Sequence, residues 1–157
     1  MIFNNDRLIE LGLSIHPAPE PVGSYVQCVQ ANGLLFLSGG ISVNGDQGIY
    51  GKVGQDIDLA TAQQAARYAL LNRLAVIEKH LGGFDLLTRI VAVNGFVNCT
   101  PDFTDHAKVL NGASDLLVEL FGPEAAHSRT AVGVASLPLN VAVEISMIVE
   151  CETDYAG

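Results

Sequence analysis

The sequence predicts an α+β domain in which two helices cover one face of a mixed sheet. Two segments, 56–81 and 100–121, carry apolar residues three or four positions apart, as amphipathic helices do. Runs rich in β-branched residues precede, separate and follow them, at 25–43, 90–97 and 129–151. The predicted order is therefore β-β-β-α-β-α-β-β, and a length of 157 residues fits a single domain.

Residues 1–21 are expected to form a lead-in and not a second domain. Asn5 or Asp6 would cap a short helix that ends at Gly12, because both side chains accept hydrogen bonds from backbone amides. Prolines at positions 17, 19 and 21 then keep the chain extended. This leaves residues 22–151 for the domain and 152–157 for a C-terminal tail.

A hairpin is expected to open the domain. Asn32-Gly33 separates two apolar runs, and this dipeptide favours the left-handed conformations of a two-residue hairpin turn. The glycine-spaced segment from Gly39 to Gly54 lacks the phosphate-binding patterns G-x-x-x-x-G-K-[ST] and G-x-G-x-x-G. We therefore expect turns between short strands in this segment.

The two helices have recognisable start and stop signals. The first begins at Asp56 or Asp58 and ends at Gly82, and its apolar stripe is expected to lie on the sheet. The second is capped by Thr100 and ends at Gly122-Pro123. The strand between them contains Gly95, which indicates a bulge or a close approach of another chain segment.

The last two strands are expected to pair as a hairpin, broken at Leu137-Pro138 because proline cannot donate to a ladder. Alternation places Arg129 on a face with small residues and Glu144 on the less apolar face of the second arm. Such a hairpin would separate the two charges by roughly 13 Å at 3.3 Å per residue. We therefore expect them to reach one ligand from neighbouring subunits. On spacing alone, a strand-end arginine and a solvated edge glutamate remain an alternative.

Several short motifs resemble the RidA family, also called the YjgF/YER057c/UK114 family. The run Ser-Arg-Thr-Ala-Val-Gly-Val at 128–134, with Leu137-Pro138 and Val143-Glu144, resembles the C-terminal signature of that family. Gly23-Ser24-Tyr25 and Ser38-Gly39-Gly40 are similar to its G-x-Y and S-G-Q stretches, with Gly40 in place of the glutamine. The resemblance implies a chorismate-mutase-like fold and a barrel-like homotrimer with clefts between adjacent subunits.

The resemblance also implies roles for individual residues. In the deaminases of the family, the arginine that matches Arg129 binds a substrate carboxylate, and the glutamate that matches Glu144 helps to position the hydrolytic water. A guanidinium can grip a carboxylate with two parallel hydrogen bonds, which suits this role. The residues expected to line the cleft are Tyr25, Ser38, Gly39, Asn98 and Asn111. On the residues alone, an ordinary strand aromatic at Tyr25 and a simple turn residue at Ser38 remain alternatives. No metal or organic cofactor is expected.

The composition limits the partners that we expect. Hydrophobic residues make up 49% of the chain and charged residues 16%, which favours self-association. The net charge of −9 disfavours nucleic acid and anionic membranes. Neither the three cysteines nor the four histidines show metal-ligand spacing. The first residues lack a secretory pattern, so we expect a cytoplasmic protein.

The leading functional hypothesis is a RidA-like deaminase that hydrolyses enamines or imines derived from amino acids to 2-oxo acids and ammonia. The alternative is a trimer that binds small carboxylates or has a regulatory role, with little turnover. Gly40 and Ser24, which differ from the family pattern, keep this alternative open. A ribonuclease is disfavoured by the acidic composition.

Overall fold

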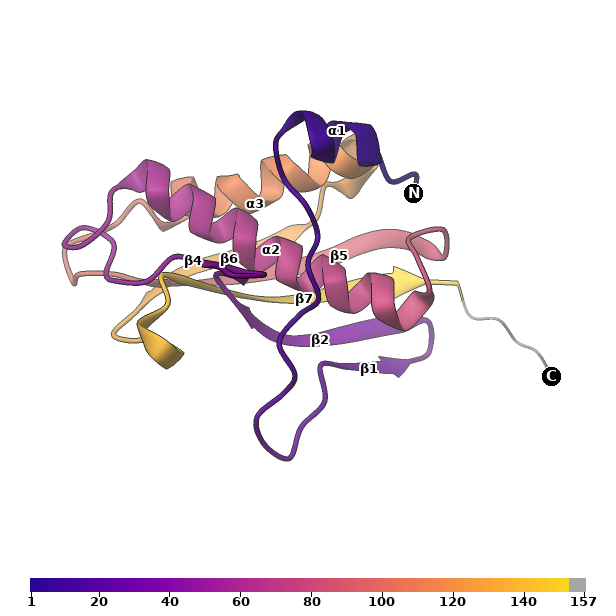
Figure 1. The fold of residues 1–157 in the computed structure, drawn as a ribbon, viewed down its shortest axis with the longest axis horizontal. Helices are drawn as coiled ribbons and strands as arrows, with labels where there is room; N and C mark the ends of the chain where they lie inside the picture. Colours follow the sequence, from indigo (N-terminus) through magenta and orange to yellow (C-terminus); the bar gives the residue numbers. More distant parts are fainter. Residues whose placement is uncertain (153–157) are drawn as a thin grey trace.

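The computed structural model describes residues 1–152, and Figure 1 shows their arrangement. Of the predicted tail at 152–157, all but Glu152 lies outside the described residues. The helices and strands in the described part are α1 (Asn5–Glu10), β1 (Cys28–Ala31), β2 (Leu34–Ile41), β3 (Val43–Asn44), β4 (Gln47–Gly48), α2 (Leu59–Leu81), β5 (Leu87–Asn98), α3 (His106–Phe121), β6 (Ser128–Val134) and β7 (Val143–Cys151), with short 3-10 turns at Pro123–Ala125 and Pro138–Asn140.

The predicted α+β class is confirmed. Five strands form a sheet in the order β1-β2-β7-β5-β6, while β3 and β4 pair as a small separate ribbon. Neighbouring strands in the large sheet are antiparallel except for β5 and β6, which are parallel. The helices α2 and α3 lie side by side over one face of this sheet (Figure 1). No helix within residues 1–152 is both long and apolar enough to cross a membrane.

The predicted pairing of the last two strands is wrong, because β5 lies between β6 and β7. Val93 of β5 pairs with Arg129 of β6, while Phe96 of β5 pairs with Glu144 of β7. Parallel β5 and β6 need a crossover connection, and α3 supplies it. β7 takes the centre of the sheet because its alternate residues from 143 to 151 are all buried on the helix side.

Local signals account for most element ends. Asn32 and Gly33 have φ of 50° and 78°, which confirms the predicted hairpin turn. Asp58 caps α2 by accepting a hydrogen bond from the Thr61 amide at 2.9 Å, and Gly82 ends the helix with φ of 75°. The predicted cap of α3 at Thr100 is wrong by five residues, because the observed N-cap is Asp105 and the helix begins at His106. Thr100 continues the extended chain, and its amide bonds the Val53 carbonyl at 3.0 Å.

The core lies between the sheet and the two helices, which approach each other closely at Gly112. A Cβ built on Gly112 would lie 2.9 Å from the carbonyl carbon and 3.0 Å from the Cα of Gln63, and closer still to its oxygen. Gly95 provides a second close approach, because a Cβ there would collide with the side chain of Leu110. The expected close approach at Gly95 is therefore confirmed.

Replacing Gly112 with alanine is expected to destabilise the fold. The collision with backbone atoms costs about 1–3 kcal/mol, which outweighs the gain of up to about 1 kcal/mol in helix propensity. Gly82→Ala is the matched control: nothing lies within 4 Å of its Cβ, so only the left-handed conformation costs about 1 kcal/mol. Urea unfolding measures both losses. A Gly112→Ala protein as stable as the native one would contradict the α2–α3 packing.

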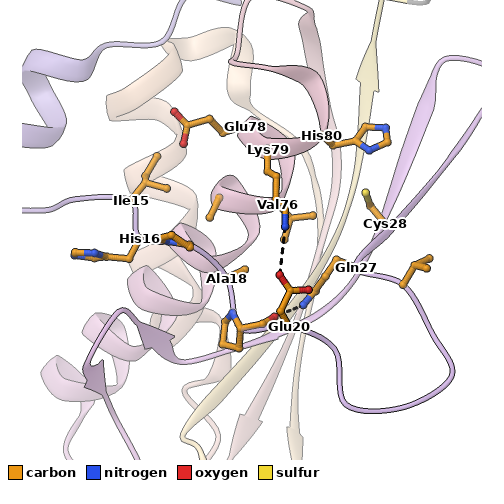
Figure 2. Close-up of a pocket in the computed structure, with 14 residues that line it drawn as sticks. Ile15, His16, Ala18, Glu20, Gln27, Cys28, Val76, Glu78, Lys79 and His80 are labelled. Atoms are coloured by element: carbon orange, nitrogen blue, oxygen red, sulfur yellow. Dashed lines mark hydrogen bonds and ion pairs between the residues drawn. The ribbon is translucent and has the colours of Figure 1, made fainter.

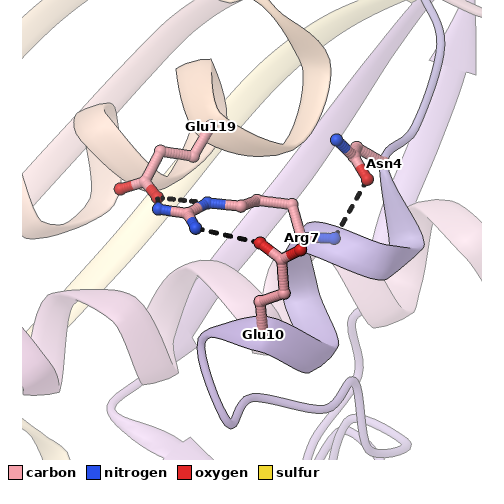
Figure 3. A network of polar contacts seen from close by, with 4 residues as sticks. All are labelled: Asn4, Arg7, Glu10 and Glu119. Carbon is pink, nitrogen blue, oxygen red and sulfur yellow. Dashed lines mark hydrogen bonds and ion pairs between the residues drawn. The ribbon is translucent and has the colours of Figure 1, made fainter.

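The N-terminal lead-in packs on α3. Asn4, one residue before the predicted cap, accepts a hydrogen bond from the Arg7 amide and begins α1. Arg7 donates to Glu119 Oε2 of α3 from Nε at 2.9 Å and from Nη2 at 2.6 Å, and it also pairs with Glu10 (Figure 3). The ring of Phe3 packs on the core aromatics Phe84 and Phe121. The lead-in thus adds to the core of the domain.

The face of the sheet opposite the helices carries exposed apolar side chains. Val29 of β1, Phe36 of β2 and Val132 of β6 are 55%, 42% and 40% exposed, whereas Leu35 and Leu37, on either side of Phe36, are buried on the helix side. No helix among the described residues covers this face (Figure 1). A bare apolar sheet face of this kind is typical of a surface that contacts another chain.

Candidate ligand site

The predicted site residues fall into two clusters and one separate position. Glu144 lies with Gly39 at the pairing of β2 and β7. Arg129 lies with Asn111 where β6 meets α3. Asn98 is held at the end of β5 by bonds of its own. We call the first group the Glu144 cluster and the second the Arg129 cluster.

The Glu144 cluster forms where β2 bulges. One extra residue of β2 lies between the pairs Leu37↔Met147 and Gly40↔Ile145, so the chain bends at Ser38 and Gly39. A Cβ on Gly39 would lie 2.9 Å from the Glu144 carboxyl carbon and closer still to its Oε1. Only glycine therefore leaves room for the carboxylate at this point of the strand.

Ser38 anchors the loop that carries Tyr25. Its hydroxyl donates to the Val26 carbonyl at 2.7 Å, and its amide donates to the Gln27 carbonyl at 2.9 Å. Tyr25 itself is half-exposed. The Ser38 hydroxyl thus makes a hydrogen bond within the protein. Its role in the cleft remains a prediction.

Arg73 of α2 lies behind the Glu144 cluster and was not predicted for the site. It is 1% exposed, and its Nη1 donates to the Ser38 carbonyl at 2.6 Å. Its Nη2 donates to Gln27 Oε1 at 3.1 Å and to Asn72 Oδ1. The sequence signal was a single cation within a stretch of leucines and alanines on the buried side of α2.

Burial and the neighbouring charge shift the pKa values of Glu144 and Arg73 in opposite directions. Burial raises the pKa of the half-buried Glu144 carboxyl above its ordinary value, and the positive charge of Arg73 partly offsets this. Burial lowers the pKa of Arg73 to about 10, against the effect of the Glu144 charge. Arg73 is therefore still a cation at neutral pH, next to a carboxyl group that takes up a proton more readily than usual.

In the Arg129 cluster, residues of α3 hold the guanidinium of Arg129. Nη1 donates to Asn111 Oδ1 at 2.8 Å and to Ser114 Oγ at 3.1 Å, and Nη2 donates to the Ala107 carbonyl at 3.3 Å. Asn111, predicted for the cleft, thus orients the arginine. The exposed guanidinium is fixed in one direction before any ligand arrives.

Ser114 and His127 extend this cluster and were not predicted for the site. His127 Nδ1 lies 2.7 Å from the Ala125 carbonyl, which can only accept, so Nδ1 carries the proton. His127 Nε2 then accepts from the Ser114 hydroxyl at 3.0 Å. Alternation offered a sequence signal, because residue 127, directly before β6, falls on the same face as residue 129.

Asn98 is fully buried and uses its amide within the protein. Its Nδ2 donates to the carbonyls of Gly51 and Val141 and to Asn140 Oδ1, at 3.1–3.3 Å. Its Oδ1 accepts from Lys52 Nζ at 2.8 Å. These bonds tie together the two loops that flank the end of β5.

Arg129 and Glu144 do not meet within one chain. Their partners on β5 are Val93 and Phe96, so the two Cα atoms lie two strand spacings and three residues apart, or roughly 14 Å. Arg129 also points toward α3, whereas Glu144 lies on the face away from the buried residues of β7. A ligand of a few heavy atoms cannot contact both from the same subunit.

A cavity of about 730 Å³ lies between the proline-rich lead-in and α2 (Figure 2). Gln27 connects the two: its Oε1 accepts from Arg73 and its Nε2 donates to the Pro19 carbonyl. Glu20 and Lys79 form an exposed ion pair of 3.3 Å across the opening. The lead-in is thus linked to Arg73 through a single side chain.

A family model described as Endoribonuclease L-PSP matches residues 15–151. Over 137 residues the chain is 31% identical to a 2-iminobutanoate/2-iminopropanoate deaminase of Dermatophagoides farinae, covering 86% of this chain and 91% of the relative.

The chain is also similar to proteins of solved structure. A protein of unknown function from Agrobacterium tumefaciens, Atu1372, is 38% identical with a TM-score of 0.88, covering 94% of this chain and 91% of its own. TdcF of E. coli, solved with bound serine, is 26% identical with a TM-score of 0.60, covering 97% and 99%.

Proposed function

Because the chain belongs to the Endoribonuclease L-PSP family, also called the YjgF/RidA family, we propose that it hydrolyses imines of amino acids to 2-oxo acids and ammonia. The observation that carries this proposal is the fixed guanidinium of Arg129, held by Asn111 and Ser114. Both the imine substrate and the 2-oxo acid product bear a carboxylate that such a group binds with two hydrogen bonds.

Glu144 supplies the second group that the reaction needs. Water adds to the imine carbon, one of its protons passes to a base, and the nitrogen gains protons until it leaves as ammonia. A half-buried carboxylate whose pKa is raised above its ordinary value is a better base for this transfer than an exposed one. The reaction leaves the overall oxidation state unchanged, so Arg129 and Glu144 need no redox partner.

We further propose that each cleft takes Arg129 from one subunit and Glu144 from its neighbour. The separation of roughly 14 Å within one chain supports this arrangement, because both groups must reach one small ligand. The apolar face with Val29, Phe36 and Val132 provides a surface on which a homotrimer can form.

The alternative is a trimer that binds small carboxylates with little turnover. The structure of TdcF with bound serine supports a small-ligand site in a related protein. The word endoribonuclease in the family description points to RNA, but a net charge of −9 opposes binding to a polyanion.

The proposed activity is tested with freshly generated 2-iminopropanoate and 2-iminobutanoate. Release of the 2-oxo acids above the spontaneous rate, measured in the presence and absence of the protein, supports a deaminase. Binding of 2-oxo acids by calorimetry without any acceleration would leave the binding protein as the better description. Cleavage of RNA without imine hydrolysis would overturn both.

A further inference from the structure

The buried arginine of α2 has neutral hydrogen-bond partners. The Arg73 guanidinium donates to the Ser38 carbonyl and to the amide oxygens of Gln27 and Asn72. Among the ion pairs closer than 4.0 Å within residues 1–152, none involves Arg73. A buried cation without a carboxylate in contact is costly, and an apolar side chain of similar volume is often at least as stabilising.

The chain makes space for this cation at Gly40. A Cβ on Gly40 would lie 2.7 Å from Cζ and 2.8 Å from Cδ of Arg73, and closer still to Nε. The Nε–H group itself is buried without a hydrogen-bond partner among the described residues. Hydrogen bonding within the described residues therefore does not fully explain why the guanidinium lies here, because one of its N–H groups has no acceptor.

Glu144 lies against Gly39, which is flanked by the two residues that Arg73 contacts, Ser38 and Gly40. Against the effect of burial, the pKa of Arg73 is raised by Glu144 first, then by Tyr25 and Cys28. These groups come from three different elements: β7, the loop before β1, and β1 itself. The charge that acts on Glu144 in return is that of Arg73. The cation thus lies where it favours the ionised form of a half-buried carboxyl group.

We propose that Arg73 is a positioning residue for Glu144, keeping the carboxylate ionised while holding the bulged Ser38-Gly39 backbone against which it lies. The proposal rests on the proposed function, in which ionised Glu144 takes a proton from water. Through Gln27, the same guanidinium is joined to Pro19, so the lead-in supports this arrangement from behind.

The test is a direct titration of Glu144 by NMR in protein labelled with ¹³C at the glutamate carboxyl carbons. The signal of Glu144 is identified by its absence in Glu144→Gln. Arg73→Met removes the charge and keeps a side chain of similar length, whereas Arg73→Lys keeps the charge without the planar fork. Near-UV circular dichroism establishes that each variant retains native packing.

Arg73→Met is expected to raise the pKa of Glu144 by about one unit, and Arg73→Lys to leave it within a few tenths of the native value. In the pH profile of kcat/KM, the acid limb should move to higher pH by the same amount. At pH values below that limb, kcat/KM should therefore fall roughly tenfold. Because the titration does not require turnover, an inactive native protein would refute the proposed function without deciding the role of Arg73.

An unchanged pKa of Glu144 in folded Arg73→Met would overturn the proposal and leave Arg73 with a structural role. If Arg73→Met does not fold, Gly40→Ala serves as the second variant, because its added Cβ displaces the guanidinium without removing the charge. It is expected to shift the pKa of Glu144 in the same direction by a smaller amount. No shift in folded Gly40→Ala would also count against the proposal.

Discussion

Replacing Arg129 with alanine is expected to reduce kcat/KM for imine hydrolysis by about two to three orders of magnitude. Two charge-assisted hydrogen bonds to a carboxylate contribute about 3–4 kcal/mol together, and 1.4 kcal/mol corresponds to a factor of ten. Steady-state release of 2-oxo acid from 2-iminopropanoate measures the loss. The fold should not change, because the guanidinium is exposed and bonded to the surface of α3.

Arg129→Lys is the matched control for this prediction. The ammonium group keeps the charge, but its three N–H donors cannot serve Asn111, Ser114 and both carboxylate oxygens together, so we expect most of the loss to remain. Binding of 2-oxo acids should weaken in parallel in both variants. Near-native activity of Arg129→Ala would show that another group binds the carboxylate.

Glu144→Gln is expected to lower kcat by about two to four orders of magnitude, the range for removal of a general base. Gln keeps the shape of the side chain beside Gly39 but cannot take a proton from water. Because Arg129 still binds the carboxylate, KM should change little. A large rise in KM with an unchanged kcat would instead make Glu144 a binding residue.

Glu144→Gln is also expected to change the stability of the fold, and this effect can be measured independently of catalysis. The folded-state pKa of Glu144 is raised, so its contribution to stability is fully present below the unfolded pKa and is lost as pH rises through the folded pKa. Glu144→Gln should therefore gain stability relative to the native protein at neutral pH, and this gain should disappear below about pH 4.5. Urea unfolding at the two pH values measures the difference.

The elements of this fold could be predicted because their signals are local. Asn32-Gly33 sets a turn, and Asp58 and Gly82 bound α2, through the chemistry of a few neighbouring residues. Strand order was not predictable in the same way. Nothing within 128–151 indicates that β5 separates its two strands, because that choice depends on pairing with residues 87–98. The separation of Arg129 and Glu144 expected from the wrong pairing, roughly 13 Å, is nevertheless close to the roughly 14 Å given by the observed strand register.

The site was predictable where a side chain belongs to a short motif. Tyr25, Ser38, Gly39, Glu144 and Arg129 were found in this way, and their roles remain predictions. Three further side chains depend on tertiary contacts: Arg73 reaches β2 from α2, and the Ser114–His127 pair joins α3 to the chain before β6. In the sequence each of these looks like an ordinary helix or loop residue, because the contacts that place it at the site, Arg73 with Ser38 and Ser114 with His127, span 35 and 13 positions.

The most direct test of the shared cleft is to mix two inactive variants. Arg129→Ala and Glu144→Gln subunits are unfolded together, refolded at equal amounts, and checked by native mass spectrometry for mixed forms of the proposed trimer. Random assortment places an intact Arg129 opposite an intact Glu144 in about a quarter of the clefts, so about a quarter of the native activity should return. Mixed trimers that stay as inactive as either parent would contradict a cleft built from two subunits.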